Sequence, residues 1–188
     1  MPETDTQVSA ESLDSAEIRI KKVKKNSKGV VTIHYQRPNG DEFDDFTMAC
    51  KSYPHPDFLQ ALADLVPHAA EICELPQSYH ENLQVSGVSF SYKDDNMGAV
   101  ITAQKKLKTH PAPLIINTPH KPVEPYAEGG DDSATLSTGC VMILDRIQKE
   151  AELYIGGKRG VAPVEDGDEV VGIDAEEQAD RAASDATE

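Results

Sequence analysis

The chain has 188 residues, with 33 acidic and 18 basic side chains and a formal net charge of −15. No apolar run approaches the roughly 20 residues of a membrane-spanning helix, and the first residues have neither the basic nor the apolar region of a signal peptide. The three cysteines are widely spaced. These features argue against membrane proteins, secreted proteins and disulfide scaffolds, and we expect a cytoplasmic protein with reduced thiols.

The negative charge is concentrated at the two ends of the chain. Residues 1–17 hold five acids and no Lys or Arg, and residues 160–188 hold ten acids and one arginine. The intervening residues 18–159 are nearly neutral, with 17 basic and 18 acidic side chains. We therefore predict one domain between two disordered acidic tails. The C-terminal tail either keeps the protein soluble, or competes for basic surface of the domain or recruits partners.

The first half of the domain is predicted to form three antiparallel strands followed by a helix. The strands are predicted at residues 17–25, 30–36 and 42–50. The turns between them are predicted at residues 26–29 and 37–40. Asp57 is the expected N-cap of a helix in which apolar residues recur at helical spacing from Phe58 to Ile72. Because Pro67 cannot lie unstrained inside this helix, we predict a kink, or a break at Val66 with Pro67 opening a second short helix.

The second half begins with three further predicted strands. They cover residues 82–92, 98–108 and 114–117. In the first of them the apolar residues change from odd to even positions at Ser86-Gly87, which indicates a β-bulge. The second also fits a helical pattern, although its Val-Ile-Thr content favours a strand. The third is fully apolar and is expected to be buried, and a long loop is predicted over residues 118–133.

A helix predicted from Ser137 to Ile155 ends the domain. Apolar residues recur every three or four positions from Cys140 to Tyr154 and form a stripe for the core, and Gly156-Gly157 supplies the helix end. The predicted order is βββα–βββα, an α+β fold in which an antiparallel β-meander carries helices on one face. Whether the two halves are a true duplication is left open.

The second half also carries a family resemblance. It contains the stretch GVSFSYKDDNMGAVITAQKKLKTHPAPLIINTPHKPVEPY and, after the last helix begins, the segment EAELYIGGKR. Together these resemble small uncharacterised proteins of tailed bacteriophages and prophages, over about residues 55–159. The resemblance implies phage origin and action in the host cytoplasm during infection. It implies no catalytic residues.

Motifs for catalysis or metal binding are missing from the sequence. The chain has no nucleophile elbow, P-loop or dinucleotide-binding motif. The pairs Cys50/His55 and His68/Cys73 lack the spacing of a structural zinc site. Three aspartate pairs in predicted turns, at 44–45, 94–95 and 131–132, could hold a divalent cation, but solvated turn residues are the ordinary explanation. We therefore predict no enzyme activity, no cofactor and no metal.

Basic side chains form two clusters that are typical of polyanion binding. The first lies on the first predicted hairpin and comprises Arg19, Lys21, Lys22, Lys24, Lys25 and Lys28. The second lies near a strand end and comprises Lys105, Lys106 and Lys108. Tyr35 and Tyr92 are expected beside these cations, where their rings could stack on bases. The alternative is that the lysines lie on an edge strand and prevent aggregation.

Two functions follow from these patterns. The first is a phage accessory protein that binds single-stranded nucleic acid through the lysine-rich hairpin, with the acidic tail controlling access and phage replication or recombination proteins as further partners. The second is a protein-binding module that contacts a host or phage protein through a sheet edge or a helix face, without nucleic acid.

Overall fold

The computed structural model describes residues 18–93, 96–126 and 134–161. The predicted N-terminal tail, nearly all of the C-terminal tail and two of the aspartate pairs lie outside these ranges. The elements, in chain order, are β1 (Arg19–Lys25), β2 (Val31–Asn39), β3 (Glu42–Cys50), α1 (Pro56–Asp64), α2 (Val66–Ile72), the 3₁₀ helix η1 (Gln77–Asn82), β4 (Leu83–Lys93), β5 (Asn96–Lys105), β6 (Leu114–Asn117), β7 (Lys121–Pro122) and α3 (Thr138–Ile155).

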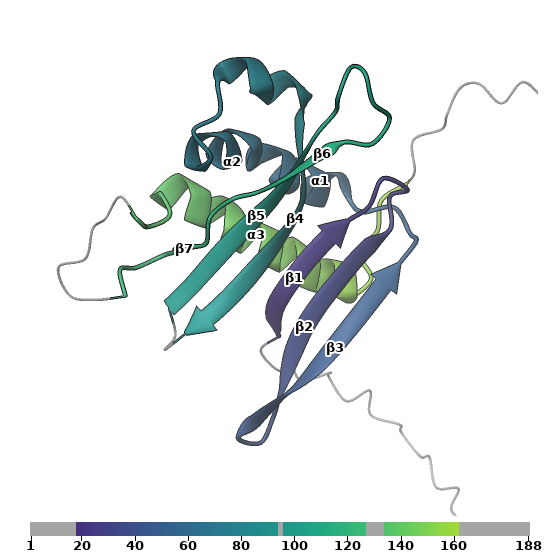
Figure 1. Ribbon diagram of the computed structural model, residues 1–188. Coiled ribbons are helices and arrows are strands. Elements are labelled where there is room, and N and C mark those ends of the chain that lie inside the picture. The colour runs from purple at the N-terminus through teal and green to yellow at the C-terminus, as the bar shows by residue number, and fades with distance from the viewer. Residues whose placement is uncertain (1–17, 94–95, 127–133, 162–188) are drawn as a thin grey trace, which may run out of the picture.

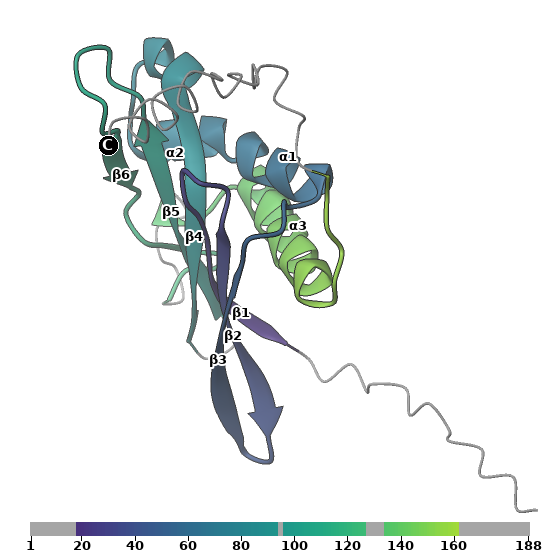
Figure 2. The same ribbon diagram turned by 90° about the vertical axis from the view of Figure 1, so that its right-hand side faces the viewer.

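The strands form one antiparallel sheet with the order β3-β2-β1-β4-β5-β6, and β7 pairs with β5. Helices α1, α2 and α3 lie on one face of this sheet, and none of the described helices covers the other face (Figures 1 and 2). The predicted α+β class, with helices on one face of an antiparallel sheet, is confirmed. We call the uncovered side the open face.

The core lies between the sheet and the helices, and α3 contributes a continuous apolar stripe to it. The predicted stripe is buried and comprises Cys140, Leu144, Ile147, Ala151 and Tyr154. The Ser137 hydroxyl accepts a hydrogen bond from the Cys140 N–H at 3.4 Å, which caps the first turn of the helix. Gly157 has a φ of 106° and follows the helix, as the predicted glycine end requires.

The first predicted helix is divided into two, as Pro67 requires. Helix α1 ends at Asp64, and α2 begins at Val66 with the proline in its first turn. The prediction that Asp57 caps α1 is wrong. His55 is the N-cap, and its Nδ1 accepts a hydrogen bond from the Asp57 N–H at 3.3 Å. The Asp57 carboxylate is instead bound to a lysine from the end of the domain, described below.

The predicted β-bulge is confirmed in β4. The register of β4 against β5 shifts between Val85 and Gly87, so that Ser86 is the extra residue. The Ser86 hydroxyl donates a hydrogen bond to the Thr102 carbonyl oxygen at 3.3 Å. The shift places Val85 and Val88 on the same, covered face, where both are buried. The predicted strand that follows is also confirmed as β5.

Two predictions for the second half are wrong. Strand β6 is not buried, because it is an edge strand that pairs only with β5, and Leu114 and Ile115 are 48% and 50% exposed. The predicted loop after it contains a strand, β7, which pairs with Gly98 and Ala99 of β5. The last part of that loop, residues 127–133, lies outside the described residues.

Candidate nucleic-acid interface

Strand β1, which carries most of the first basic cluster, lies in the interior of the sheet. It pairs with β2 on one side and with β4 on the other, whereas β3 and β6 end the strand order. The pairing with β4 covers Lys22–Lys24. Lys22 and Lys24 therefore do not protect a sheet edge, because a residue paired on both sides has no free edge.

The side chains of Lys22 and Lys24 are exposed on the open face. In β1 the buried residues are Ile20 and Val23, which belong to the core against the helices. A register irregularity between Ile20 and Lys22 accounts for their odd spacing of three. Lys22 and Lys24 flank Val23 and are exposed, since neighbouring side chains of a strand point to opposite faces.

Lys22 and Lys24 lie in the middle of two rows of residues that cross the sheet. The row through Lys22 comprises Thr47, His34, Lys22, Ser89 and Val100. The row through Lys24 comprises Ala49, Thr32, Lys24, Gly87, Thr102 and Asn117. Neither row contains an acidic residue, and no ion pair among the described residues involves either lysine. The centre of the open face is therefore positive.

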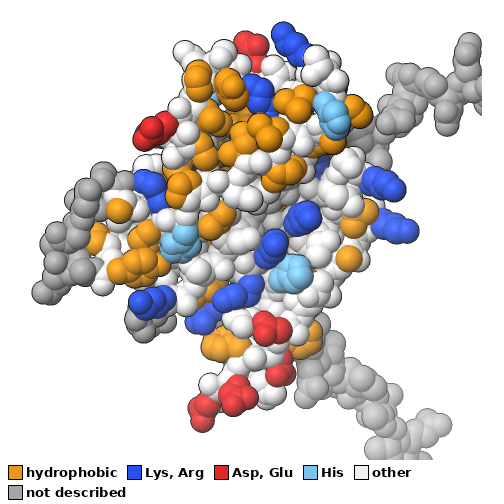
Figure 3. Space-filling model, viewed as in Figure 1, with side chains coloured by type: hydrophobic (Ala, Val, Ile, Leu, Met, Phe, Trp, Pro, Cys, Tyr) orange, Lys and Arg blue, Asp and Glu red, His pale blue; other side chains and the backbone are white. Residues whose placement is uncertain are grey.

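A shallow recess of about 200 Å³ lies beside the two lysines. Gly87 forms part of its lining, and Ser89, Thr102 and Asn117 supply polar groups. The Thr102 hydroxyl donates to the Asn117 side-chain oxygen at 2.8 Å. Figure 3 shows Lys and Arg side chains along the middle of this face and acidic side chains at the tip of the β2–β3 hairpin.

The structure does not bring the two predicted tyrosines to this face. Tyr35 is buried on the covered face, where its ring stacks on Phe46 with 5.4 Å between the ring centres. The Tyr92 hydroxyl donates to the Ile20 carbonyl oxygen at 2.8 Å and accepts from the Gln148 side chain of α3 at 2.6 Å. Burial raises the pKa of Tyr92 to about 12. Neither ring lies beside Lys22 and Lys24.

Arg19 and Lys21 lie apart from the open-face lysines, near a groove of about 380 Å³. The groove lies where β1 passes beyond its pairing with β4, between the β2–β3 hairpin and α3. The Arg19 guanidinium lies 4.4 Å from the ring centre of Phe43 and 4.9 Å from that of Tyr92, and the Lys21 ammonium lies 5.3 Å from the Tyr92 ring. Arg19 and Lys21 thus make cation–π contacts with aromatic rings. The contact of Arg19 with Phe43 was not predicted from the sequence.

The remaining basic residues lie at one end of the sheet. Lys25 ends β1 and Lys28 lies in the turn that follows. Lys105 lies at the corresponding end of β5, separated from β1 by β4, and its ammonium is 2.9 Å from the ring centre of Tyr79. Lys106 and Lys108 are exposed in the segment after β5. The two clusters thus share an end of the sheet without forming one continuous edge.

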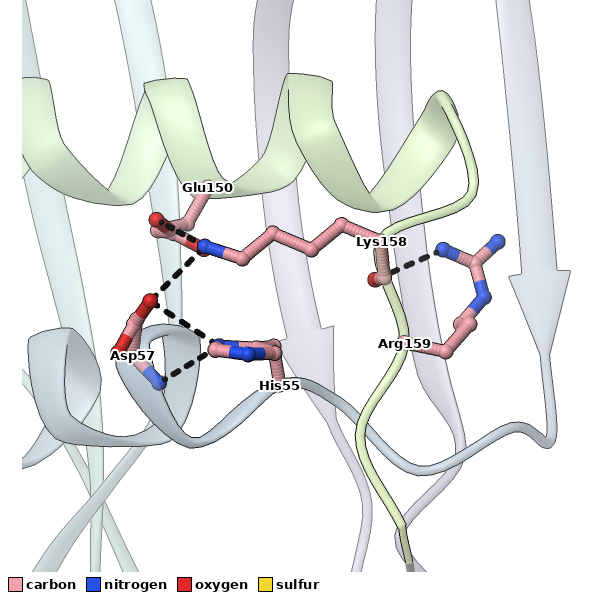
Figure 4. A network of polar contacts seen from close by, with 5 residues as sticks. All are labelled: His55, Asp57, Glu150, Lys158 and Arg159. Carbon is pink, nitrogen blue, oxygen red and sulfur yellow. Dashed lines mark hydrogen bonds and ion pairs between the residues drawn. The ribbon is translucent and has the colours of Figure 1, made fainter.

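A separate polar network joins the end of the domain to α1 and α3 (Figure 4). Lys158 Nζ lies 2.9 Å from both carboxylate oxygens of Glu150, which is buried, and 2.9 Å from Asp57 Oδ2. Asp57 Oδ2 is also 3.0 Å from His55 Nδ1. The ligand atoms of His55, Asp57 and Glu150 lie within 4.8 Å of one another, but the ammonium of Lys158 already binds both carboxylates. We regard this network as a structural clasp and not as a metal site.

The clasp has a predictable pH dependence. The hydrogen bond from Lys158 lowers the pKa of Asp57 below its ordinary value of 3.8. The stabilisation from this pair is therefore complete above the ordinary pKa and is lost as the pH falls through the lowered value in the folded state. The pKa of Lys158 is raised, chiefly by its hydrogen bond with Glu150, so its contribution is lost only when the pH rises through that raised value.

We expect Lys158→Met to lower the Tm by several degrees, because it leaves the buried Glu150 carboxylate without its cation. Adding Glu150→Gln should restore part of the loss, since a neutral amide is less costly to bury. Thermal melts followed by circular dichroism at pH 7 measure both variants. A double variant that melts no higher than Lys158→Met would contradict this account of the clasp.

Comparison with known proteins adds no assignment: no family model, curated protein or solved structure matches the chain. The resemblance to tailed-phage proteins stays a prediction from the residues quoted above. Among the helices of the described ranges, none has both the length and the hydropathy needed to cross a membrane.

Proposed function

We propose that the open face binds single-stranded nucleic acid, with Lys22 and Lys24 contacting phosphates. The observation that carries this proposal is the placement of both lysines in the middle of an uncovered sheet, in rows without a single acid. A phosphate backbone that reaches these lysines releases its condensed counterions, which is the main source of sequence-independent affinity.

The polar groups around the lysines support an extended ligand. Ser89, Thr102, Asn117 and His34 offer donors and acceptors to phosphates, sugars and bases along the face. The acids at the tip of the β2–β3 hairpin limit the interface at one end (Figure 3). The bound strand therefore runs from Lys22 past Lys24 toward the β1–β2 turn with Lys28. A phage protein in the host cytoplasm, as the resemblance implies, would meet such strands during replication or recombination.

Tyr35 and Tyr92, whose rings were predicted to stack on bases, are not part of this interface. The binding that we propose is thus dominated by phosphate contacts, and it should be weakly selective for sequence and steeply dependent on salt. Loss of two phosphate contacts should reduce the slope of log affinity against log salt by about 1.4, since each contact to a single strand contributes about 0.7.

Charge reversal at the two lysines tests the proposal. We expect Lys22→Glu with Lys24→Glu to weaken the binding of a labelled 20-nucleotide oligothymidylate by about 30-fold or more at 50 mM salt. Fluorescence anisotropy measures the affinity, and circular dichroism confirms the fold. The matched control is Arg146→Glu with Lys149→Glu, two exposed cations of α3 on the covered side of the sheet, which should change the affinity by less than about threefold.

An equal loss in both double variants, or no binding by the unmodified protein at 50 mM salt, would overturn the proposal. The second candidate function, a protein-binding module, would then be the better account. The observation that favours it is the edge strand β6, which exposes Leu114 and Ile115 and pairs on one side only. A partner could add a strand there through main-chain hydrogen bonds.

A further inference from the structure

The C-terminal acidic segment, residues 162–188, begins close to the basic end of the sheet. The Gly160 N–H donates to the Tyr53 carbonyl oxygen at 2.9 Å, and Arg159 forms a β-bridge with Pro54. These bonds hold the end of the domain beside the segment that follows β3. The C-terminal segment therefore starts from a fixed point of the fold.

The register of the sheet relates this point to the lysines. Cys50, the last residue of β3, pairs with Val31 of β2, and Val31 pairs with Lys25 of β1. Neighbouring strands are about 4.8 Å apart, so the row from Cys50 to Lys25 spans about 10 Å. The chain thus leaves the fold at the end of the sheet that carries Lys25 and the β1–β2 turn with Lys28 (Figure 1).

The charge of the segment complements the open face. Residues 162–188 hold ten acids and one arginine, whereas both rows through Lys22 and Lys24 are free of acids. An extended chain spans about 3.3 Å per residue, so 27 residues reach far beyond the few strands that separate this exit point from Lys22. Tethering also gives the segment an effective concentration in the millimolar range at the face.

We infer that the acidic C-terminal segment occupies the open face and competes there with nucleic acid. This inference rests on the proposed function, because it assigns the regulation of the same site. The segment is a polyanion like the proposed ligand, so both contact Lys22 and Lys24. Competition between tethered and free polyanions is strongest at low salt, where the contacts are least screened.

The test uses the full chain with carboxylates replaced by amides. In one variant the five acids Glu165, Asp166, Asp168, Glu169 and Asp174 become Gln or Asn, and in the matched control the same is done to Glu3, Asp5, Glu11, Asp14 and Glu17. The N-terminal segment enters the fold at Ile18, at the other end of β1 from the turn. Both variants change the net charge by the same amount.

We expect the C-terminal variant to bind the oligothymidylate about fivefold to tenfold more tightly than the unmodified protein at 50 mM salt, and equally well at 500 mM. The N-terminal variant should stay within about twofold of the unmodified protein at both salt concentrations. Equal affinities for all three proteins at 50 mM, or equal gains in the two variants, would overturn the inference. Equal gains would indicate an effect of net charge alone.

A measurement without nucleic acid separates this inference from the proposed function. A carbodiimide activates a carboxylate, and a lysine amine within contact distance displaces the urea and forms an amide. We expect mass spectrometry of the unmodified protein to find such amides between Lys22 or Lys24 and acids of residues 162–188, and to find them reduced at 500 mM salt. Cross-links without oligonucleotide binding would support the tail contact and refute the proposed function. Oligonucleotide binding that depends on Lys22 and Lys24, without these cross-links, would refute the tail contact alone.

Discussion

Leu144→Asp should abolish the folded state of the domain. Leu144 lies in the middle of α3 and is 0% exposed, so the aspartate carboxylate has no access to water in the native structure. Burying an unpaired charge costs several kcal/mol, which is comparable to the roughly 5–15 kcal/mol that hold an ordinary domain together. Far-UV circular dichroism should show no cooperative thermal transition for this variant.

The matched control for this variant lies two residues away in the same helix. Met142 is 69% exposed, so Met142→Asp adds the same carboxylate to α3 where water can solvate it. We expect this control to melt cooperatively, within a few degrees of the unmodified protein. A cooperative melt of Leu144→Asp near the unmodified Tm would show that the stripe does not face the core.

The elements that could be predicted from the sequence are those whose cause is local. The spacing from Cys140 to Tyr154 requires a helix with one apolar side, and Pro67 requires the division of the preceding helix. The β-bulge at Ser86-Gly87 was predicted because the apolar residues change from odd to even positions within one strand. In each case the pattern and its physical cause lie within about 20 residues.

The position of β1 could not be predicted in the same way. Its pairing with β4 consists of three residue pairs between segments that are more than 60 residues apart, Lys22–Lys24 and Gly87–Ser89. Nothing in a short window of sequence specifies such a contact. The clasp has the same origin, because Lys158 and Asp57 are 101 residues apart in the sequence.

The burial of Tyr35 on the covered face could have been predicted from the sequence. Val31, Ile33 and Tyr35 alternate along one strand, so the tyrosine belongs with the apolar residues of the covered face, as the structure has it. Lys22 and Lys24 alternate with buried Val23 and belong to the opposite face. Tyr35 and the two lysines therefore lie on opposite faces of one sheet and share no surface, although they are close in the sequence.

Gly87 is the position where a single methyl group should most disturb the sheet. A Cβ atom at Gly87 would lie 2.5 Å from the Val23 carbonyl oxygen and 3.3 Å from the Lys24 Cα, both of which are backbone atoms of β1. Backbone in the interior of a sheet cannot move aside as a flexible side chain can. Gly87→Ala must therefore push β1 away from β4, although only three residue pairs join these strands.

We expect Gly87→Ala to cost about 3 kcal/mol of unfolding free energy, at the upper end of the range for overpacked sites. In a domain of this size that loss corresponds to a fall in Tm of roughly 10 °C. Denaturant unfolding and thermal melts measure the two quantities. Ser89→Ala is the control, because Ser89 pairs with Lys22 in the same short ladder and the change removes only a hydroxyl group. A Gly87→Ala variant as stable as this control would show that β1 and β4 do not approach as closely as the structure has them. The pairing of Lys24 with Gly87 would then be wrong.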